Sequence, residues 1–248
     1  MKIQILSDLH HEFGIANIQF TSIDMLIIAG DLNIGIKGIN WLKENISGIP
    51  VIYVLGNHEY YKGNYPKTLY KIKDCAVDTN IHVLENESFI FNNITFHGCT
   101  LWTDFELHGN AAFYGSMCQQ KMNDYKMIKL GASYNKLRSV DIYKIHKQSL
   151  RWLEDSLKNT TTEKNIVITH HAPSLKSVPS DFRENPLSAA YASKLDDFIL
   201  LYQPDYWIHG HIHTPVEYKT GETKIICNPH GYINEEYNGF NNNLTIEI

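Results

Sequence analysis

Eight side chains that can bind divalent metals occur in five short segments spread over most of the chain. The segments read SDLH, AGD, GNHE, THH and HGHIH, and each follows an apolar run. The eight candidate ligands are Asp8, His10, Asp31, Asn57, His58, His170, His211 and His213. Carboxylate, amide and imidazole groups suit divalent transition metals, and the absence of cysteine among these eight residues argues against a closed structural zinc site. So many ligands suit two ions rather than one.

A pair of metal ions would suit the hydrolysis of phosphate esters. Such an ester resists attack because the nucleophile must approach negatively charged oxygens. Two divalent ions roughly 3.5 to 4 Å apart lower the pKa of a shared water and clamp the phosphoryl oxygens for in-line displacement. A metal-binding histidine also needs an acceptor for its second ring nitrogen, and Glu59 and the backbone carbonyls of these loops are candidates.

The apolar runs before these segments predict buried β-strands. They cover residues 3–6, 25–29, 51–55, 166–169 and 206–208, and helical spacing is found between them at 39–46 and 65–76. This alternation predicts an α/β sheet with functional loops at the carboxyl ends of its strands. Further strands are predicted at 81–84, 88–91, 94–99, 216–219, 224–227 and 244–248. Asn92-Asn93 predicts a hairpin, and two sheets packed face to face with helices outside would accommodate all of these elements.

The order of the five segments resembles the calcineurin-like metallophosphoesterase superfamily, from about residue 2 to about residue 232. The segments that carry the resemblance are Asp8-x-His10, Gly30-Asp31, Gly56-Asn57-His58-Glu59, His170 and Gly210-His211-x-His213. The resemblance implies an α/β (α+β) fold, a four-layer αββα sandwich of two mixed β-sheets flanked by helices.

The same resemblance implies a role for each ligand. The first metal would be held by Asp8, His10 and His213. The second would be held by Asn57, His170 and His211. Asp31 would bridge the two ions, with one carboxylate oxygen facing each, and His58 would act beside the metals on the substrate phosphate. The segment at 169–173 offers two histidines where one is required, and we favour His170 over His171 because it directly follows the strand-like run.

The stretch from about 103 to 140 separates the metal-binding segments. A helix is predicted after it over 141–157, with Ser139 or Asp141 as its N-cap. We interpret the stretch as a small helical cap insertion within one domain covering 1–248. Its aromatic and amide side chains would line a pocket for an organic leaving group: Phe105, Phe113, Tyr114, Gln119, Asn123, Tyr125 and Tyr134. The alternative is a helical excursion that only packs on the core.

Composition narrows the classes of function. The 248 residues can bury one substantial core, and the net charge of -5 argues against a broad basic surface for extended nucleic acid. Four widely spaced cysteines without a CxxC pair predict reduced thiols in the cytoplasm. The sequence has no signal-peptide pattern and no apolar stretch long enough to span a membrane.

These patterns together predict a metal-dependent phosphoric ester hydrolase. It would cleave a phosphomonoester or phosphodiester bond of a small or medium substrate by in-line attack of a metal-bridging hydroxide, with His58 and Asp31 as catalytic residues. Two divalent ions are expected as cofactors, Mn²⁺ being favoured, although Fe, Zn, Co and Ni also suit nitrogen and oxygen ligands. The alternatives are a non-catalytic scaffold that binds a protein partner, and a nuclease. Known scaffolds of this kind have usually lost ligands or the active-site histidine, and this chain keeps all of them.

Overall fold

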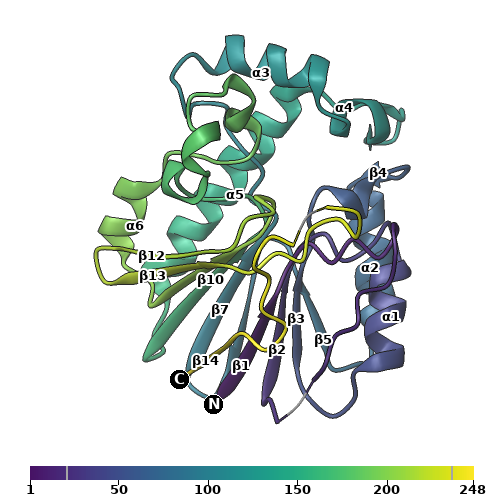
Figure 1. The fold of residues 1–248 in the computed structure, drawn as a ribbon, viewed down its shortest axis with the longest axis vertical. Coiled ribbons are helices and arrows are strands. Elements are labelled where there is room, and N and C mark those ends of the chain that lie inside the picture. Colours follow the sequence, from purple (N-terminus) through teal and green to yellow (C-terminus); the bar gives the residue numbers. More distant parts are fainter. Residues whose placement is uncertain (21, 236) are drawn as a thin grey trace.

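A computed structural model describes residues 1–20, 22–235 and 237–248, and it contains two large β-sheets that face each other (Figure 1). The first sheet has the strand order β14-β1-β2-β3-β5. Its members are β1 (Lys2–Leu6), β2 (Met25–Ala29), β3 (Val51–Val54), β5 (Ile81–Leu84) and β14 (Thr245–Glu247). Strands β1, β2, β3 and β5 are parallel, and β14 pairs antiparallel to β1. The sheet is therefore mixed, as predicted.

The second sheet has the order β12-β13-β11-β10-β7-β6. Its strands are β6 (Glu87–Phe91), β7 (Ile94–Cys99), β10 (Lys164–Thr169), β11 (Tyr206–His209), β12 (Val216–Thr220) and β13 (Thr223–Cys227). The four inner strands are parallel, and each edge strand pairs antiparallel to its neighbour. Asn92 and Asn93, both with positive φ, form the predicted turn between β6 and β7, because asparagine tolerates the left-handed conformation.

Three apolar clusters divide the molecule into four layers. Ile5 and Ile27 of the first sheet pack against Ile168 and Ile208 of the second sheet, between the two. Helices α1 (Lys37–Asn45) and α2 (Lys67–Ala76) cover the outer face of the first sheet. Helices α5 (Ser139–Asn159) and α6 (Asp196–Tyr202) cover the outer face of the second. Because the central strands are buried on both faces, they are continuously apolar rather than alternating. The αββα sandwich is confirmed.

The N-cap predicted for α5 is wrong. The helix begins at Ser139, and its N-cap is Arg138. Asp141, the third helical residue, instead accepts a hydrogen bond from the backbone N–H of Arg138 at 3.1 Å. The Asp141 carboxylate thus satisfies the N–H group of the N-cap residue from within the first turn, and by sequence alone this role is hard to distinguish from that of an N-cap.

The segment at 103–140, called the cap below, lies at one end of the sandwich, away from both termini (Figure 1). It contains α3 (Ala111–Lys121), α4 (Asp124–Met127), β8 (Lys129–Leu130) and β9 (Asn135–Lys136). The last two join β4 (Asn64–Tyr65) in a third sheet that was not predicted, because two-residue strands carry no alternation of polarity. In the part of the chain that the structure describes, no helix has both the length and the apolar character to cross a membrane.

Candidate metal centre

Five loops at the carboxyl ends of parallel strands bring the predicted ligands to one edge of the sandwich. The loops follow β1, β2 and β3 in the first sheet and β10 and β11 in the second. Five candidate ligands in these loops have positive φ: Asp8, His10, Asp31, His211 and His213. This backbone region is uncommon for residues other than glycine and carries strain, which concentrates at functional sites.

One group of side chains gathers around His10. The Nε2 atoms of His10 and His213 lie 2.9 Å apart. Oδ1 of Asp8 is 3.7 Å from His213 Nε2, and Oδ2 of Asp31 is 3.6 Å from His10 Nε2. Ligand atoms of Asp8, His10 and His213 all lie close enough together to share one metal ion. These are the residues predicted for the first metal.

A second group gathers around His170. Its Nε2 atom lies 3.1 Å from Nδ1 of His211, 3.1 Å from Oδ1 of Asn57 and 3.4 Å from Oδ2 of Asp31. Ligand atoms of Asp31, His170 and His211 are again close enough to share an ion. The structure therefore brings together all the side chains predicted for the second metal.

Asp31 belongs to both groups, but in a way that differs from the expectation. The same oxygen, Oδ2, faces His10 and His170, whereas Oδ1 accepts the backbone N–H of His58 at 2.8 Å. One oxygen therefore faces both groups, because the loop after β3 engages the other oxygen. A single carboxylate oxygen is thus placed between the two groups.

The second ring nitrogens of two candidate ligands, His170 and His213, face acceptor oxygens that orient their rings. Nδ1 of His170 lies 3.0 Å from the carbonyl oxygen of Ala29, which leaves Nε2 as the free acceptor. Nδ1 of His213 lies 3.1 Å from Oε2 of Glu235 in the same manner. The buried Nε2 of His211 has no partner among the described residues, while its Nδ1 faces the group. Nitrogen and oxygen donors in two groups fit two divalent ions.

His171 lies outside both groups, although it neighbours His170. Its backbone N–H donates to the carbonyl oxygen of Thr100 at 3.3 Å, and its ring lies 5.2 Å from that of Trp102. Burial lowers the pKa of His171 well below its ordinary value. The geometry favours His170 as the candidate ligand, while the ring of His171 packs against Trp102 and lies 4.2 Å from the ring of His211.

Glu59 has a different role from the one expected. It accepts backbone N–H groups of Asp31 at 3.2 Å, Leu32 at 2.8 Å and Gly56 at 2.8 Å, and the hydroxyl of Tyr53 at 2.7 Å. Burial raises its pKa to about 7. Glu59 therefore joins the loops after β2 and β3 to each other, instead of orienting a histidine ring.

Glu12, which the sequence interpretation missed, orients two rings. Its Oε1 lies 2.7 Å from Nδ1 of His58 and 3.2 Å from Nδ1 of His10. Burial raises the pKa of Glu12, but the hydrogen bonds of His10 and His58 outweigh burial and lower it to about 2. Burial lowers the pKa of His58, but the charges of Asp31 and Glu12 raise it to about 9. The only sequence signal was an acidic residue two positions after His10.

Asp124 in the cap also reaches the site. Its Oδ1 accepts from Nδ2 of Asn57 at 2.8 Å and from the hydroxyl of Tyr61 at 2.9 Å. The first bond turns the amide oxygen of Asn57 toward His170. The ring of Tyr61 stacks on His58 with centroids 4.1 Å apart. The first residue of α4 thus supports both a candidate ligand and the candidate catalytic histidine.

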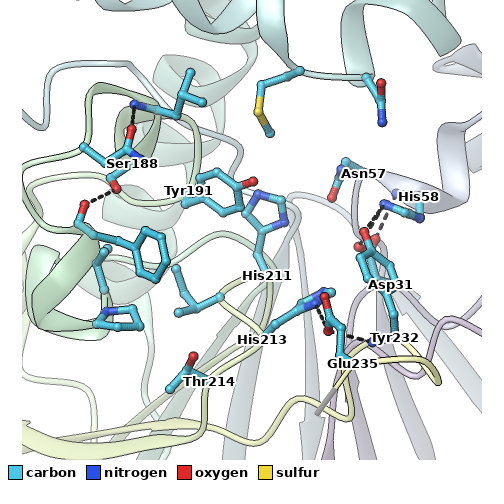
Figure 2. Close-up of a pocket in the computed structure, with 18 of the residues that line it drawn as sticks. Asp31, Asn57, His58, Ser188, Tyr191, His211, His213, Thr214, Tyr232 and Glu235 are labelled. Carbon is cyan, nitrogen blue, oxygen red and sulfur yellow. Dashed lines mark hydrogen bonds and ion pairs between the residues drawn. The ribbon is translucent and has the colours of Figure 1, made fainter. Parts of the chain in front are cut away.

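A pocket of about 620 Å³ opens beside the two groups. Figure 2 shows Asp31, Asn57 and His58 on one side of it and Ser188 and Tyr191 on the other. The opposite wall is formed by residues 178–191, which include the short 3-10 helices η3 (Ser180–Phe182) and η4 (Pro186–Ala190). This wall was not predicted.

Most of the cap residues expected in the pocket lie elsewhere. Of the seven aromatic and amide residues expected there, only Asn123 is among the described residues that line the pocket. Its neighbours Lys121 and Met122 also line the pocket. Phe105 is buried in the core, and Phe113 and Tyr134 are exposed. The expectation failed because only the carboxyl end of α3 faces the pocket, while the rest of this helix packs against α5 and η4.

Comparisons with known proteins agree with this geometry. The family model described as calcineurin-like phosphoesterase matches residues 1–215. An uncharacterized protein of Acanthamoeba polyphaga mimivirus is 29% identical over 246 residues, which covers 90% of this chain and 83% of the relative.

Two solved structures share the fold. Phosphopantetheinyl Hydrolase (PptH) from Mycobacterium tuberculosis superimposes with a TM-score of 0.72 at 15% identity, over 93% of this chain and 89% of that one. GAP50, the anchor in the inner membrane complex of Plasmodium, gives a TM-score of 0.50 at 16% identity, over 100% of this chain and 77% of its own. Since the family match spans most of the sequence, this chain belongs to the calcineurin-like phosphoesterase family.

Proposed function

We propose that this protein is a dinuclear metal-dependent phosphoesterase that hydrolyses a small or medium phosphorylated molecule. The observation that carries the proposal is the position of Asp31 Oδ2, which lies 3.6 Å from His10 Nε2 and 3.4 Å from His170 Nε2. One carboxylate oxygen between two donor groups is the arrangement expected for a bridged pair of ions.

Seven side chains would hold the ions. Asp8, His10 and His213 would bind one, Asn57, His170 and His211 would bind the other, and Asp31 would bind both. When bound, two divalent ions supply positive charge for the phosphoryl oxygens and lower the pKa of a water. We favour Mn²⁺, although mixed nitrogen and oxygen ligands also suit Fe, Zn, Co and Ni.

His58 would act on the substrate itself. The hydrogen bond between its Nδ1 and Glu12 fixes the orientation of the ring. Its Nε2 lies 4.0 Å from Asp31 Oδ2, and the residue lines the pocket. From there Nε2 can donate a hydrogen bond to a phosphoryl oxygen or a proton to the leaving oxygen.

A scaffold function is the second candidate, because GAP50, described as an anchor, shares the fold. The complete set of converging ligands favours the enzyme. A nuclease is disfavoured by the net charge of -5. The four free cysteines support our proposal of a cytoplasmic location.

Activity of His58→Ala on two substrates tests this function. We expect the Mn²⁺-loaded protein to hydrolyse both an alkyl phosphate and p-nitrophenyl phosphate. For the alkyl ester, whose leaving group is poor, the substitution should lower kcat about 10² to 10⁴-fold, and for the p-nitrophenyl ester the loss should be smaller.

Three results would count against parts of the proposal. Equal losses for the two esters would exclude proton donation to the leaving oxygen. Loss of a metal ion from His58→Ala would make His58 a ligand. Failure of the native protein to hydrolyse any phosphomonoester or phosphodiester, with any of the five metals, would contradict the phosphoesterase function.

A further inference from the structure

The wall of the pocket that faces the candidate metal centre is mainly apolar. Residues 178–191 contribute Val178, Pro179, Phe182 and Leu187 to it. Met122 of the cap and Ile212, between two candidate ligands, extend the apolar surface. A substrate whose phosphate lies at the metal centre would therefore direct the rest of the molecule along this surface.

The segment that forms the wall is held by its own hydrogen bonds. The hydroxyl of Ser188 donates to the carbonyl oxygen of Phe182 at 2.6 Å, which joins η3 to η4. The backbone N–H of Asn185 donates to the same carbonyl at 2.9 Å, and Arg183 Nε donates to the carbonyl of Val178 at 2.9 Å. Because the segment is folded by its own hydrogen bonds, binding would not have to order it, and apolar contacts can contribute fully to affinity.

Charged side chains are scarce on this surface. Apart from the histidines and Asp31, the charged residues among the described pocket residues are Lys121 and Glu235, and Glu235 pairs with His213 at 3.1 Å. No arginine is among those described residues. Outside the metal centre, the pocket has few positive charges that could neutralise a substrate with several negative groups. We therefore expect the negative charge of the substrate to be confined to its phosphoryl group.

We propose that this wall binds the alcohol part of the phosphate ester, and that this alcohol is uncharged and largely apolar. The inference rests on the phosphoesterase function proposed above, since the metal centre must hold the phosphoryl group. Phe182 is the residue of this wall that we expect to contact the alcohol most extensively. Its side chain lines the pocket and is 57% exposed, so a large apolar ring is available for a ligand to cover.

The test measures binding of two alkylphosphonates, which resemble the esters but contain a P–C bond in place of the P–O bond to the alcohol. Ethylphosphonate and hexylphosphonate are titrated calorimetrically into the Mn²⁺-loaded protein. Burial of one methylene raises affinity about fourfold, and the two probes differ by four methylenes. We expect hexylphosphonate to bind at least about tenfold more tightly.

Phe113 provides a matched control for Phe182. It is also a phenylalanine, it is 56% exposed, and it lies on α3 outside the described pocket lining. Phe182→Ala should reduce the affinity ratio of the two phosphonates by about threefold or more, while Phe113→Ala should leave the ratio unchanged. Because the ratio is taken within each variant, a general loss of folded protein does not alter it.

The outcomes separate this inference from the proposed function. A ratio near one in the native protein, an absence of binding by both probes, or equal ratios in Phe182→Ala and Phe113→Ala would overturn the apolar-alcohol inference. Chain-length discrimination that depends on Phe182, in a protein that hydrolyses no phosphate ester, would support the binding surface and contradict the phosphoesterase function.

Discussion

Two regions enclose the pocket, and they differ in secondary structure. The edge that carries the candidate ligands consists of loops after parallel strands, and neighbouring loops hold each other through backbone hydrogen bonds. Asp8 N–H donates to Gly30 O at 3.0 Å, and Gly210 N–H donates to His170 O at 3.0 Å. The opposite wall consists of short 3-10 helices and one end of α3. The two sheets thus position the candidate metal ligands, and irregular segments form the wall that we propose contacts the rest of the substrate.

The two regions meet at Asp124, which belongs to the cap but supports Asn57 and Tyr61. The edge that carries the candidate ligands and the cap are therefore connected through Asp124. Substitutions at the edge should affect metal content and turnover together, and substitutions in the cap should affect metal content only through this contact.

The largest effect is expected for Asp31→Asn, because this side chain is shared by both metal groups. Both ions should bind more weakly, and activity should fall by more than the roughly 100-fold that loss of an outer-shell partner can cost. Asp8→Asn, at a ligand that belongs to one group, should cost less. Metal analysis and kcat/KM of the two variants check this order. Retention of both ions and near-normal turnover in Asp31→Asn would show that the bridging role is wrong.

The next effect distinguishes the two adjacent histidines. His170→Ala should lower the affinity for one metal ion and the activity together, by about 10 to 100-fold or more. His171→Ala should retain both ions, because its ring packs near Trp102 and lies outside the two groups. Metal titrations of both variants make the measurement. The reverse pattern would assign the ligand to His171.

A smaller effect is expected for Asp124→Ala, where the cap meets the metal-binding edge. Without this acceptor the amide of Asn57 is free to rotate, and the affinity of the second metal should fall about tenfold. The first metal site should be unaffected. Lys126→Ala, an exposed residue of the same helix, serves as the control. Equal metal affinities in the two variants would mean that the cap does not support the metal centre.

The smallest effect on the candidate metal centre is expected at Glu85, a buried carboxylate directly after β5 that supports the fold. Its Oε2 accepts from the backbone N–H of Thr100 at 3.0 Å and from the Thr100 hydroxyl at 2.6 Å. Burial raises the pKa of Glu85 from 4.5 to about 7. A raised pKa means that its stabilising contribution is complete below pH 4.5 and is lost as the pH rises through 7.

Glu85→Gln removes this titration, so its stability relative to the native protein should rise between pH 5 and pH 8. The gain should be on the order of 1 to 3 kcal/mol. Urea unfolding of both proteins at several pH values measures it. Parallel pH profiles would show that Glu85 ionises normally in the folded protein.

The strands and the candidate ligands could be predicted from the sequence because the same pattern indicates both, a buried apolar run followed directly by a polar residue that can bind metal. Asp31, for example, directly follows the buried run that ends in Ala29-Gly30, and the carboxyl ends of parallel strands meet at one edge. This pattern occurs five times in the chain, in an order that resembles the calcineurin-like metallophosphoesterase superfamily. Even the choice between His170 and His171 depended on which residue directly follows the strand.

The supporting residues and the pocket wall could not be predicted in the same way. Glu12 and Asp124 lie in polar segments, where a carboxylate that orients a histidine or an amide looks like one that faces solvent. Residues 178–191 form 3-10 helices too short to show a hydrophobic period. Their positions depend on tertiary contacts such as the packing of η4 against α3, which no local pattern encodes.

Metal stoichiometry tests the dinuclear centre most directly. The protein is purified without chelator, reconstituted with Mn²⁺, freed of unbound metal and analysed for ions per chain. His213→Ala and His211→Ala, each in a different candidate group, are analysed beside it. We predict two ions in the native protein and one in each variant, and saturation of the native protein at one ion per chain would contradict the dinuclear centre.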